Sequence, residues 1–355
     1  MKIITTKAEL LGPLSRVASI VASKQTMPIL ANVLLQVSGG RLTLTCSDLE
    51  SELISSIPCD AGDGSITVPA KKLADVIKVM ADAPISLSVE ADRVIVKCGR
   101  SRHSLVTLPA SEFPATTEHE YTQTFSVPAA ELAAMMKRTE FAMAFQDVRF
   151  YLCGMLVEFR SDGIRCVATD GHRLAYAGAS GDVLHSVLIP RNAVAQIARM
   201  LDSGDAQISV SRNHIRVTCG QHIVTSKLID GRYPDYMMMA SRPPTIAVCD
   251  RAELIDGLRR VAVLANEKYR GVKIEAGAGS IKISGANERQ DESTEVIDAD
   301  TPSEIVAAWK VDYLTEALGA LESDRVEFCA SLTSGVPAAY LSDASSVHVI
   351  CCLRL

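Results

Sequence analysis

Three stretches of the sequence share one tripeptide and decide the fold: KAELLGPLSRVASIV at residues 7–21, AAELAAMMKR at 129–138 and RAELIDGLRRV at 251–261. The leucine of the shared Ala-Glu-Leu falls at positions 10, 132 and 254, so consecutive copies are 122 residues apart. Each copy opens a stretch in which apolar residues recur every three or four positions, the spacing of one face of an α-helix. A constant interval between similar helical stretches predicts three copies of one structural module.

A second helix is expected in each third of the chain. Residues 73–80 follow Pro69 and residues 194–201 follow Pro190, and in both stretches the apolar side chains keep the helical spacing. Pro128 precedes the stretch 129–138 in the same way. Residues 311–321 supply the same pattern in the last third. A proline at the first position of a helix loses no hydrogen bond, because that N–H has no partner inside the helix. These patterns predict six amphipathic helices, two in each third.

Strands are expected between the helices, where apolar and polar residues alternate: ISLSVEADRVIVK at 85–97, ISVSRNHIRV at 208–217 and VEF at 326–328. Glycine-containing turns at 39–40, 161–163 and 277–280 separate further strands. We therefore predict an α+β fold of three similar domains, each with two helices and antiparallel sheets, at residues 1–122, 123–245 and 246–355. Modules of this size exceed those of a solenoid and indicate a symmetric or pseudo-symmetric assembly, such as a closed ring.

Composition excludes several classes of protein. The 355 residues carry a formal net charge of −6, so any contact with DNA must use a local basic surface on an acidic background. The ten cysteines have no metal-ligand spacing, so we expect no metal or other cofactor and interpret them as reduced, mostly buried apolar groups. The sequence shows no signal-like N-terminus and no apolar run of about 18 residues, which predicts a cytoplasmic protein without a membrane span.

Longer motifs follow one another in a fixed order along the chain. They are MPIL (27–30), TCSDLE (45–50), RSRHSLVTLP (100–109), FAMAFQDVRFY (141–151), VATDGHRL (167–174), TSKLIDGRYPDY (225–236), NEKYRGV (266–272) and the final LRL (353–355). In this order and spacing the chain resembles the bacterial DNA polymerase III beta subunit, the sliding clamp, over essentially its whole length. That family is built from three similar domains per subunit, which the internal repeats predict independently.

The resemblance implies a DNA-clamp fold in which each chain forms half of a ring. A head-to-tail homodimer would encircle duplex DNA, with helices lining the hole and sheet edges continuing across each subunit boundary. Such a ring is a processivity factor for DNA replication and not an enzyme; it is held by topology and contacts phosphates weakly, without sequence preference. The implied partners are double-stranded DNA, a second copy of the chain, the alpha subunit of the replicative DNA polymerase, an ATP-dependent clamp loader and other proteins with a clamp-binding motif.

The resemblance also implies a pocket for a short linear peptide beside the loop 169–174. Its apolar walls would be Leu152, Leu174, Pro234, Met238, Met239, Val349, Cys351 and Leu353. Its polar edges would be Thr169, Gly171, His172, Arg173 and Arg354. Clamps commonly end in a Met-Pro-Met-Arg-like segment, whereas this chain ends in CCLRL, which predicts a roomier and more mobile wall. From the residues alone, the same apolar side chains would be assigned to a core.

Five residues are expected near DNA by the same resemblance: Lys24, Gln146, Phe150, Tyr151 and Arg270. The flat aromatic groups at 150 and 151 could also stack on the bases of single-stranded template. Basic residues on the first, second, fourth and fifth helices fit a local basic surface, although charges of this kind are also typical of a solvated helix face.

At the subunit boundary the family packs an apolar pair of the first domain against one of the third. Here Leu105 would face Val263 and Leu264. His103 stands where phenylalanine is common, and because a charged imidazole in a dry interface is costly, we expect a dimer that weakens at mildly acid pH. Opposite charges are expected to surround this contact and to favour head-to-tail pairing. They are Lys71, Lys72, Arg100 and Arg102 on one side, and Asp291, Glu292 and Glu295 on the other.

The sequence leaves two alternatives open. The CCLRL ending suggests a diverged, paralogous clamp that serves a specialised polymerase or confers drug tolerance. An enzyme that uses Asp170 and His172 as acid and base would need further convergent partners, and the other histidines show no ligand spacing.

Overall fold

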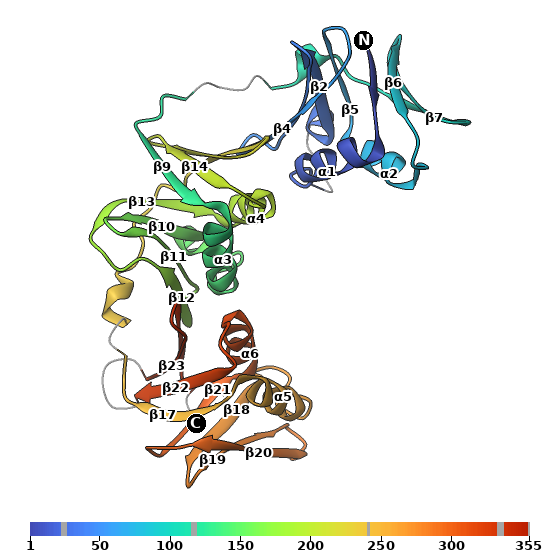
Figure 1. The fold of residues 1–355 in the computed structure, drawn as a ribbon. Helices are drawn as coiled ribbons and strands as arrows, with labels where there is room; N and C mark the ends of the chain where they lie inside the picture. Colours follow the sequence, from blue (N-terminus) through green and yellow to red (C-terminus); the bar gives the residue numbers. More distant parts are fainter. Residues whose placement is uncertain (23–26, 115–118, 240–241, 332–336, 354–355) are drawn as a thin grey trace. The chain divides into compact units, whose positions relative to one another are not determined.

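The computed structural model describes residues 1–22, 27–114, 119–239, 242–331 and 337–353. Two residues expected in functional sites, Lys24 and Arg354, lie outside these ranges. Within them the chain forms helices α1 to α6 and strands β1 to β24 (Figure 1). No helix in the described ranges is long and apolar enough to cross a membrane.

One order of elements occurs three times: strand, helix, four strands, helix, three strands. The first third contains β1 (Lys2–Thr5), α1 (Lys7–Ala18), β2 (Asn32–Ser38), β3 (Arg41–Ser47), β4 (Ser51–Pro58), β5 (Gly64–Pro69), α2 (Ala70–Val79), β6 (Ile85–Glu90), β7 (Arg93–Cys98) and β8 (Ser101–Val106). The second contains β9 (Gln123–Pro128), α3 (Ala129–Thr139), β10 (Gly154–Arg160), β11 (Gly163–Thr169), β12 (Arg173–Gly178), β13 (Val183–Pro190), α4 (Arg191–Met200), β14 (Asp205–Val210), β15 (His214–Cys219) and β16 (His222–Lys227). The third contains β17 (Thr245–Asp250), α5 (Arg251–Ala262), β18 (Gly271–Gly277), β19 (Ser280–Ala286), β20 (Glu292–Asp300), β21 (Ile305–Lys310), α6 (Val311–Ala320), β22 (Arg325–Ser331), β23 (Ala338–Ser342) and β24 (Ser346–Cys351).

The structure explains why the tripeptide Ala-Glu-Leu recurs. Its leucine is buried in all three copies, at 1%, 0% and 1% exposure for Leu10, Leu132 and Leu254. Its glutamate stands in the first turn of the helix, where a negative charge is favourable. In α1 the carboxylate of Glu9 also accepts the N–H of Thr6, while the Thr6 hydroxyl accepts the N–H of Glu9. The tripeptide therefore combines a helix start with a core contact.

The six predicted helices are confirmed, with one difference in detail. Pro69, Pro128 and Pro190 were expected at the first position of a helix. Each is instead the last residue of the preceding strand, one position before the helix, and Pro69 is the N-cap of α2. At this position, too, the missing N–H removes no intrahelical hydrogen bond.

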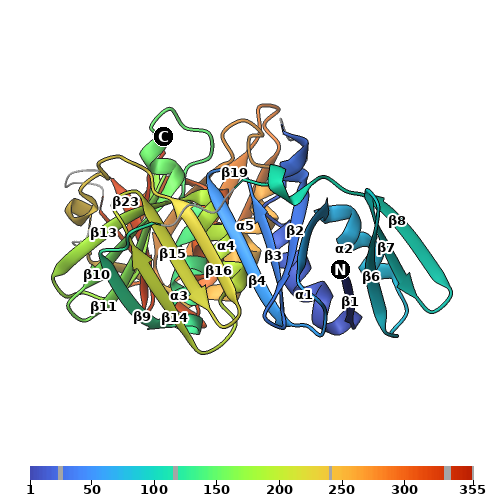
Figure 2. The ribbon, with the colours of Figure 1, turned by 90° about the horizontal axis from the view of Figure 1, so that it is seen from above.

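The chain divides into two compact units, residues 1–133 with 192–228 and residues 134–191 with 229–355. The first unit holds a four-stranded sheet, β1-β6-β7-β8, and an eight-stranded sheet, β5-β2-β3-β4-β16-β15-β14-β9. Figure 2 shows β3, β4, β16 and β15 side by side. The second unit holds a twelve-stranded sheet, β13-β10-β11-β12-β24-β23-β22-β17-β20-β19-β18-β21. All pairs of neighbouring strands are antiparallel, which confirms the predicted α+β fold. The boundaries at 122/123 and 245/246 remain a prediction, because they concern repeats rather than compact units.

Two junctions join strands from successive thirds of the chain. The first junction pairs β4 with β16, from Ser51↔Ser226 to Ser55↔His222. The second junction pairs β12 with β24, from Arg173↔Ile350 to Ala177↔Ser346. Among the described residues, β8 has no strand partner on its outer edge, and β20 pairs there only at Ala299 and Asp300, with β17. These two strand edges therefore remain open.

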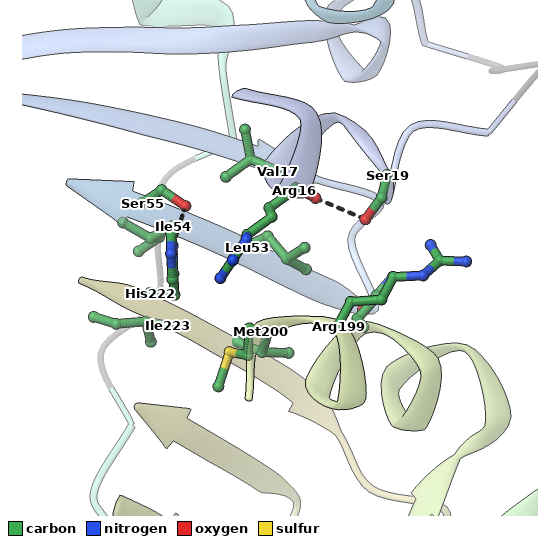
Figure 3. A pocket seen from close by; sticks show the side chains of 12 residues that line it. Arg16, Val17, Ser19, Leu53, Ile54, Ser55, Arg199, Met200, His222 and Ile223 are labelled. Carbon is green, nitrogen blue, oxygen red and sulfur yellow. Dashed lines mark hydrogen bonds between the residues drawn. The ribbon is translucent and has the colours of Figure 1, made fainter. Parts of the chain in front are cut away.

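An ion pair between a helix and the residues that follow another helix accompanies each junction. Arg16 of α1 binds Asp202, two residues after α4, at 2.9 Å. Arg138 of α3 binds Glu322, two residues after α6, at 2.5 Å. Figure 3 shows the surroundings of the first pair: Arg16 extends from α1 toward β4 and β16, beside the hydrogen-bonded Ser55 and His222 (2.8 Å).

Candidate peptide-binding and DNA-binding surfaces

The loop between β11 and β12 is a tight turn held by its own side chains. The Thr169 hydroxyl donates to the carbonyl of Arg173 (2.5 Å) and accepts the N–H of Gly171 (3.1 Å). One carboxylate oxygen of Asp170 accepts the N–H groups of His172 (2.9 Å) and Arg173 (3.0 Å). Asp170 therefore acts as a turn-forming residue, and these bonds give it a structural reason to be present without an acid–base reaction.

Gly171 allows a close approach at the tip of this turn. Its φ of +87° lies in the left-handed region that favours glycine. A Cβ added here would lie 2.8 Å from Nη1 of Arg149, so the guanidinium packs directly on the turn. Gly171 and His172 are both exposed and are available to a ligand.

Arg173, which is expected at the polar edge of the peptide pocket, makes most of its contacts within the chain. Its Nε donates to Asp170 (3.1 Å), its Nη2 donates to the carbonyl of Phe141 (2.6 Å), and its Nη1 pairs with Glu316. The guanidinium also lies 4.4 Å from the ring centre of Tyr313. With only 10% of its side chain exposed, Arg173 joins the start of β12 to α6 and to the segment after α3.

The expected apolar wall comes together across the second junction. Leu174 and Val349 are register partners on β12 and β24, although 175 positions separate them in the sequence. They share a core cluster with Tyr340 and Tyr236, and Met239 packs against this cluster. At 6% and 1% exposure, Leu174 and Val349 form the floor of the region rather than a free surface.

Pro234 and Met238 are the exposed members of the expected wall, and Met238 is 82% exposed. They flank Tyr236, the first residue of a short 3₁₀ turn (Tyr236–Met239). The buried Tyr236 hydroxyl donates to Glu158 (2.7 Å), which also forms a 2.6 Å ion pair with Arg160. This network fixes the segment that carries the exposed methionine.

The remaining wall residues lie at two places. The N–H of Cys351 donates to the carbonyl of His172 (2.9 Å), which places Cys351 at the turn, and Leu152 is 2% exposed in the 3₁₀ turn Phe150–Cys153. The N–H of Leu353 instead donates to the carbonyl of Ala308 (2.7 Å). A Cβ on Gly271 would lie 2.9 Å from Cδ1 of Leu353, so that side chain packs against β18 and β21.

Three of the residues expected near DNA lie in one segment between α3 and β10. Gln146 adopts a left-handed φ of +54°, Phe150 is 56% exposed, and the ring centres of Phe150 and Tyr151 are 5.8 Å apart, edge to face. Phe145 and Val148 in the same segment are also exposed, at 74% and 96%. The segment therefore presents flat apolar groups to solvent.

Arg270 lies apart from this segment, at the entry to β18. Its φ is +46°, and its Nε donates to both carboxylate oxygens of Asp312 at 2.9 Å. Since 42% of its side chain is exposed, the rest of the guanidinium can still contact a phosphate. Lys24, as stated above, lies outside the described residues.

The residues expected at the subunit boundary are divided between the two units. In the first unit Lys71, Lys72, Arg100 and Arg102 are exposed, and His103 and Leu105 on β8 are half-buried. In the second unit Val263 is 79% exposed, Leu264 and Glu295 are half-buried, and Asp291 and Glu292 are exposed. Glu295 accepts a hydrogen bond from Arg260 at 2.9 Å, so part of its charge is compensated within the chain.

The sequence reasoning missed Arg149 and the network of Glu158, Arg160 and Tyr236. Arg149 belongs to the motif FAMAFQDVRFY, where only the glutamine and the aromatic residues were considered. A charged residue between two large apolar ones was the available signal. Its partner Asp170 lies 21 positions away, which no local pattern reveals. Among the described residues, no group of three or more His, Cys, Asp or Glu side chains could hold a metal ion.

Comparison with known proteins covers the whole chain. Models of the N-terminal, central and C-terminal domains of the DNA polymerase III beta subunit match residues 1–117, 126–235 and 241–351. The beta sliding clamp of Pseudomonas putida is 39% identical over 98% of both chains, and that of Escherichia coli is 38% identical over the full length of both. A crystal structure of the sliding clamp from Pseudomonas aeruginosa bound to griselimycin covers both chains fully, with 38% identity and a TM-score of 0.93. The chain belongs to the DNA polymerase III beta subunit family, the bacterial sliding clamps.

Proposed function

We propose that two copies of this chain close into a ring that encircles duplex DNA in the cytoplasm and holds the replicative polymerase on its template. The observation that carries this proposal is the agreement of all three thirds with the clamp family over the full length. The chain contributes enclosure and docking surfaces, and it catalyses no reaction of its own.

The two open strand edges support the dimer. In both junctions within the chain, the strand that ends one four-stranded sheet pairs with the strand that ends the next. β8 and β20 hold the corresponding positions in the first and last thirds, and their edges are open. If β20 of one copy pairs with β8 of another, a third junction forms, and two copies close into a ring.

The charges near these two edges are complementary. Arg100 and Arg102 are exposed beside β8, while Asp291 and Glu292 are exposed at the start of β20. Opposite charges on the two edges favour head-to-tail pairing, because like edges would repel. Val263, which is 79% exposed, supplies an apolar group that a second copy would cover.

The ring is proposed to hold DNA without reading its sequence. Gln146, Phe150, Tyr151, Arg270 and Lys24 are proposed to lie near the duplex. The exposed groups among them offer few charges, which suits a protein that must slide, because many tight phosphate contacts would fix it in one place.

The turn 169–173 and the apolar residues around it are proposed to bind a short peptide. Met238 and Pro234 are exposed beside the floor formed by Leu174 and Val349, and the exposed His172 stands at its polar side. An apolar pocket with a few polar groups at its edge suits a linear motif with apolar side chains. The polymerase alpha subunit, the clamp loader and other motif-bearing proteins are the proposed ligands.

A topological experiment tests the proposal. The protein is loaded by an ATP-dependent clamp loader onto nicked circular DNA, and retention is measured before and after the circle is cut. A ring should stay on the circle, slide off the cut DNA and remain where bulky groups block both ends. The Val263→Asp variant is the control. Because Val263 is exposed, the fold should be kept, but the proposed contact with the second copy would be broken and retention on the circle should be lost. Retention on cut DNA with open ends would show ordinary DNA binding and contradict enclosure.

The alternative of a specialised clamp rests on the C-terminus. Cys351 and Cys352 are half-buried where longer side chains are common in clamps, so the wall beside the turn is proposed to prefer bulkier apolar side chains. Competition between peptides from the replicative and from a specialised polymerase would decide between the two roles. Tighter binding of the replicative peptide would exclude the specialised one.

A further inference from the structure

Arg149 contacts both functional surfaces proposed for the second unit. It stands in the segment 145–151, next to Phe150 and three positions after Gln146. Its Nη2 donates to the carbonyl of Asp170 at 3.0 Å, inside the turn that carries the peptide surface. Its Nη1 lies over Gly171. One guanidinium therefore spans from the DNA-facing segment to the peptide-binding turn.

The other side of the guanidinium is fixed by Asp147. Nε and Nη2 of Arg149 donate to the two carboxylate oxygens of Asp147, at 3.0 and 2.8 Å, and the backbone N–H of Arg149 donates to the same carboxylate at 2.8 Å. These hydrogen bonds lower the pKa of Asp147 to about 2, so its carboxylate is charged at any pH relevant to a living cell. The fork geometry orients the arginine, because the paired bonds allow only one plane.

A second contact joins the same two surfaces through the main chain. The N–H of Leu152 donates to the carbonyl of Arg149 at 2.8 Å, and its own carbonyl accepts the N–H of Ala144 at 2.9 Å. The Leu152 side chain is buried in the region proposed to bind the peptide. The segment that carries Phe150 and Tyr151 is thus held at one end by the peptide wall and in its middle by the turn.

We infer that Arg149 is a positioning residue that couples the two surfaces: a peptide bound at the turn orders the segment 145–151, and DNA contact at that segment strengthens peptide binding. This inference rests on the proposed function. A ligand that holds the turn in one arrangement holds the carbonyl of Asp170, and through it the guanidinium and the Asp147–Phe150 backbone. Coupling between two binding sites must be reciprocal. A clamp on DNA would therefore bind its polymerase more tightly than a clamp free in solution.

Lysine is the discriminating replacement at this position. Arg149→Lys keeps the positive charge beside DNA, but an ammonium group cannot make the planar pair with Asp147 and also reach Asp170. Asp147→Asn keeps the arginine and removes the charged half of the fork. Arg212→Lys is the matched control, because Arg212 is exposed in the other compact unit. If only charge mattered, the lysine variant at 149 would behave as the wild type does.

The first measurement is amide hydrogen exchange of the full-length protein, with and without a labelled peptide that carries the clamp-binding motif of the polymerase alpha subunit. In the wild type and in Arg212→Lys, the peptide should slow exchange at residues 169–174 and also at 145–151. In Arg149→Lys and Asp147→Asn, it should still protect 169–174 but lose most of its effect on 145–151. Equal protection of 145–151 in all variants would overturn the inference.

The second measurement is the affinity of the same peptide for the clamp free in solution and loaded on circular DNA. About a five-fold tightening on DNA is expected for the wild type, at the low end of typical coupling. Arg149→Lys should reduce this ratio to about one, whatever its effect on the affinity of the free clamp. An undiminished ratio in the variant would overturn the inference, as would no tightening in the wild type. A wild type that does not bind the peptide at all would contradict the proposed peptide surface itself, which is a separate result.

Discussion

The turn at Ser47–Ser51 in the first third and the turn at Thr169–Arg173 in the second are the same piece of chemistry in two settings. In each, the first hydroxyl accepts the N–H two positions on and donates to the carbonyl four positions on. In each, the aspartate that follows accepts the N–H groups two and three positions after itself. Both turns lead into a strand of a junction. The bonds that build the turn therefore serve folding, and they do not by themselves make a binding site.

Two of the differences between the turns, at the third and fifth positions, change the contacts of the turn. The third is Leu49, with a φ of +73°, in the first turn and Gly171 in the second. The fifth is Ser51 in the first turn, whose hydroxyl donates to Ser226 across the first junction at 3.1 Å. In the second turn it is Arg173, which pairs with Asp170 of its own turn and with Glu316 across the second junction. Glycine gives the second turn room for a guanidinium on its tip, and arginine ties it to α6. Peptide binding at the second turn is therefore expected to depend on these two differences.

The largest effect is expected from removal of Arg173. Arg173→Ala would leave Asp170 and Glu316 without their cation and Tyr313 without its stacking partner, at a cost of about 3 kcal/mol, because breaking a largely buried pair leaves the remaining charge uncompensated. Ser51→Ala at the matching position should cost about 1 kcal/mol, one hydrogen bond. Hydrogen exchange of β24 and β16 amides reports each junction separately. Similar losses in the two variants would break the distinction between the turns.

The second largest loss of stability is expected at the second junction when the pH is lowered. His348 on β24 is fully buried, and burial lowers its pKa to about 4, with Asp343 and Arg138 as the nearest charged groups. Because the folded state holds this imidazole neutral, its contribution is fully present above about pH 6.5 and is lost as the pH falls toward 4. Between pH 7 and pH 5 the second junction should lose about 2 kcal/mol.

The first junction provides the internal comparison for this pH effect. His222 on β16 also has a lowered pKa, caused first by burial and then by Arg16, with Asp202 acting in the opposite direction. As the pH falls, β24 amides should lose protection from hydrogen exchange before β16 amides do. Loss in the reverse order would show that the buried imidazole is not the controlling group.

Substitutions at the third position of the two turns should change the stability of the protein in opposite directions. Gly171→Ala forces a side chain into a left-handed backbone and against Arg149, which should cost about 1–2 kcal/mol and weaken peptide binding. Leu49→Gly removes a strained, half-exposed leucine and should stabilise the first turn by up to about 0.5 kcal/mol. Thermal unfolding and peptide titration of both variants test this. Destabilisation of equal size at both positions would mean that backbone strain is not what distinguishes the turns.

The sequence revealed the architecture because the architecture repeats. Leu10, Leu132 and Leu254 stand at one interval and are all buried, and each of the six helices carries its own periodic face. Local signals of this kind survive without knowledge of the fold. The pairing of β4 with β16 and of β12 with β24 left no local signal, because it joins strands more than 160 positions apart.

The candidate site could be predicted only in part from the sequence, for a related physical reason. Leu174, Val349 and Met239 were expected together from family resemblance, and the structure brings them together. Arg173 was expected at the polar edge of the pocket from the same resemblance, and its planar group is largely buried among acids and aromatic rings. Those partners lie on α6 and after α3, and Leu353 is likewise placed by a contact with β21 that no spacing predicts.

The smallest expected effect tests whether the open edges form a third junction like the other two. Arg16 and Arg138 follow their repeated leucines by six positions, and so does Arg260. Their acids, Asp202 and Glu322, directly follow the buried residues Leu201 and Leu321. The residue that follows the equivalent Met80 is Ala81, which has no charge, and Arg260 binds Glu295 of its own chain instead.

Ala81→Glu should therefore give the third junction of the proposed dimer the arginine–acid pair that the other two junctions have. The new carboxylate would face Arg260 of the second copy and tighten the dimer about two-fold, the gain typical of an exposed ion pair of about 0.5 kcal/mol. Dimer dissociation is measured at low and high salt, with Ala81→Gln as the uncharged control. The gain should appear only for the glutamate, shrink at high salt and disappear when Arg260→Gln is added. A glutamate that tightens the dimer equally without Arg260 would act on another cation, and the third junction would then differ from the two inside the chain.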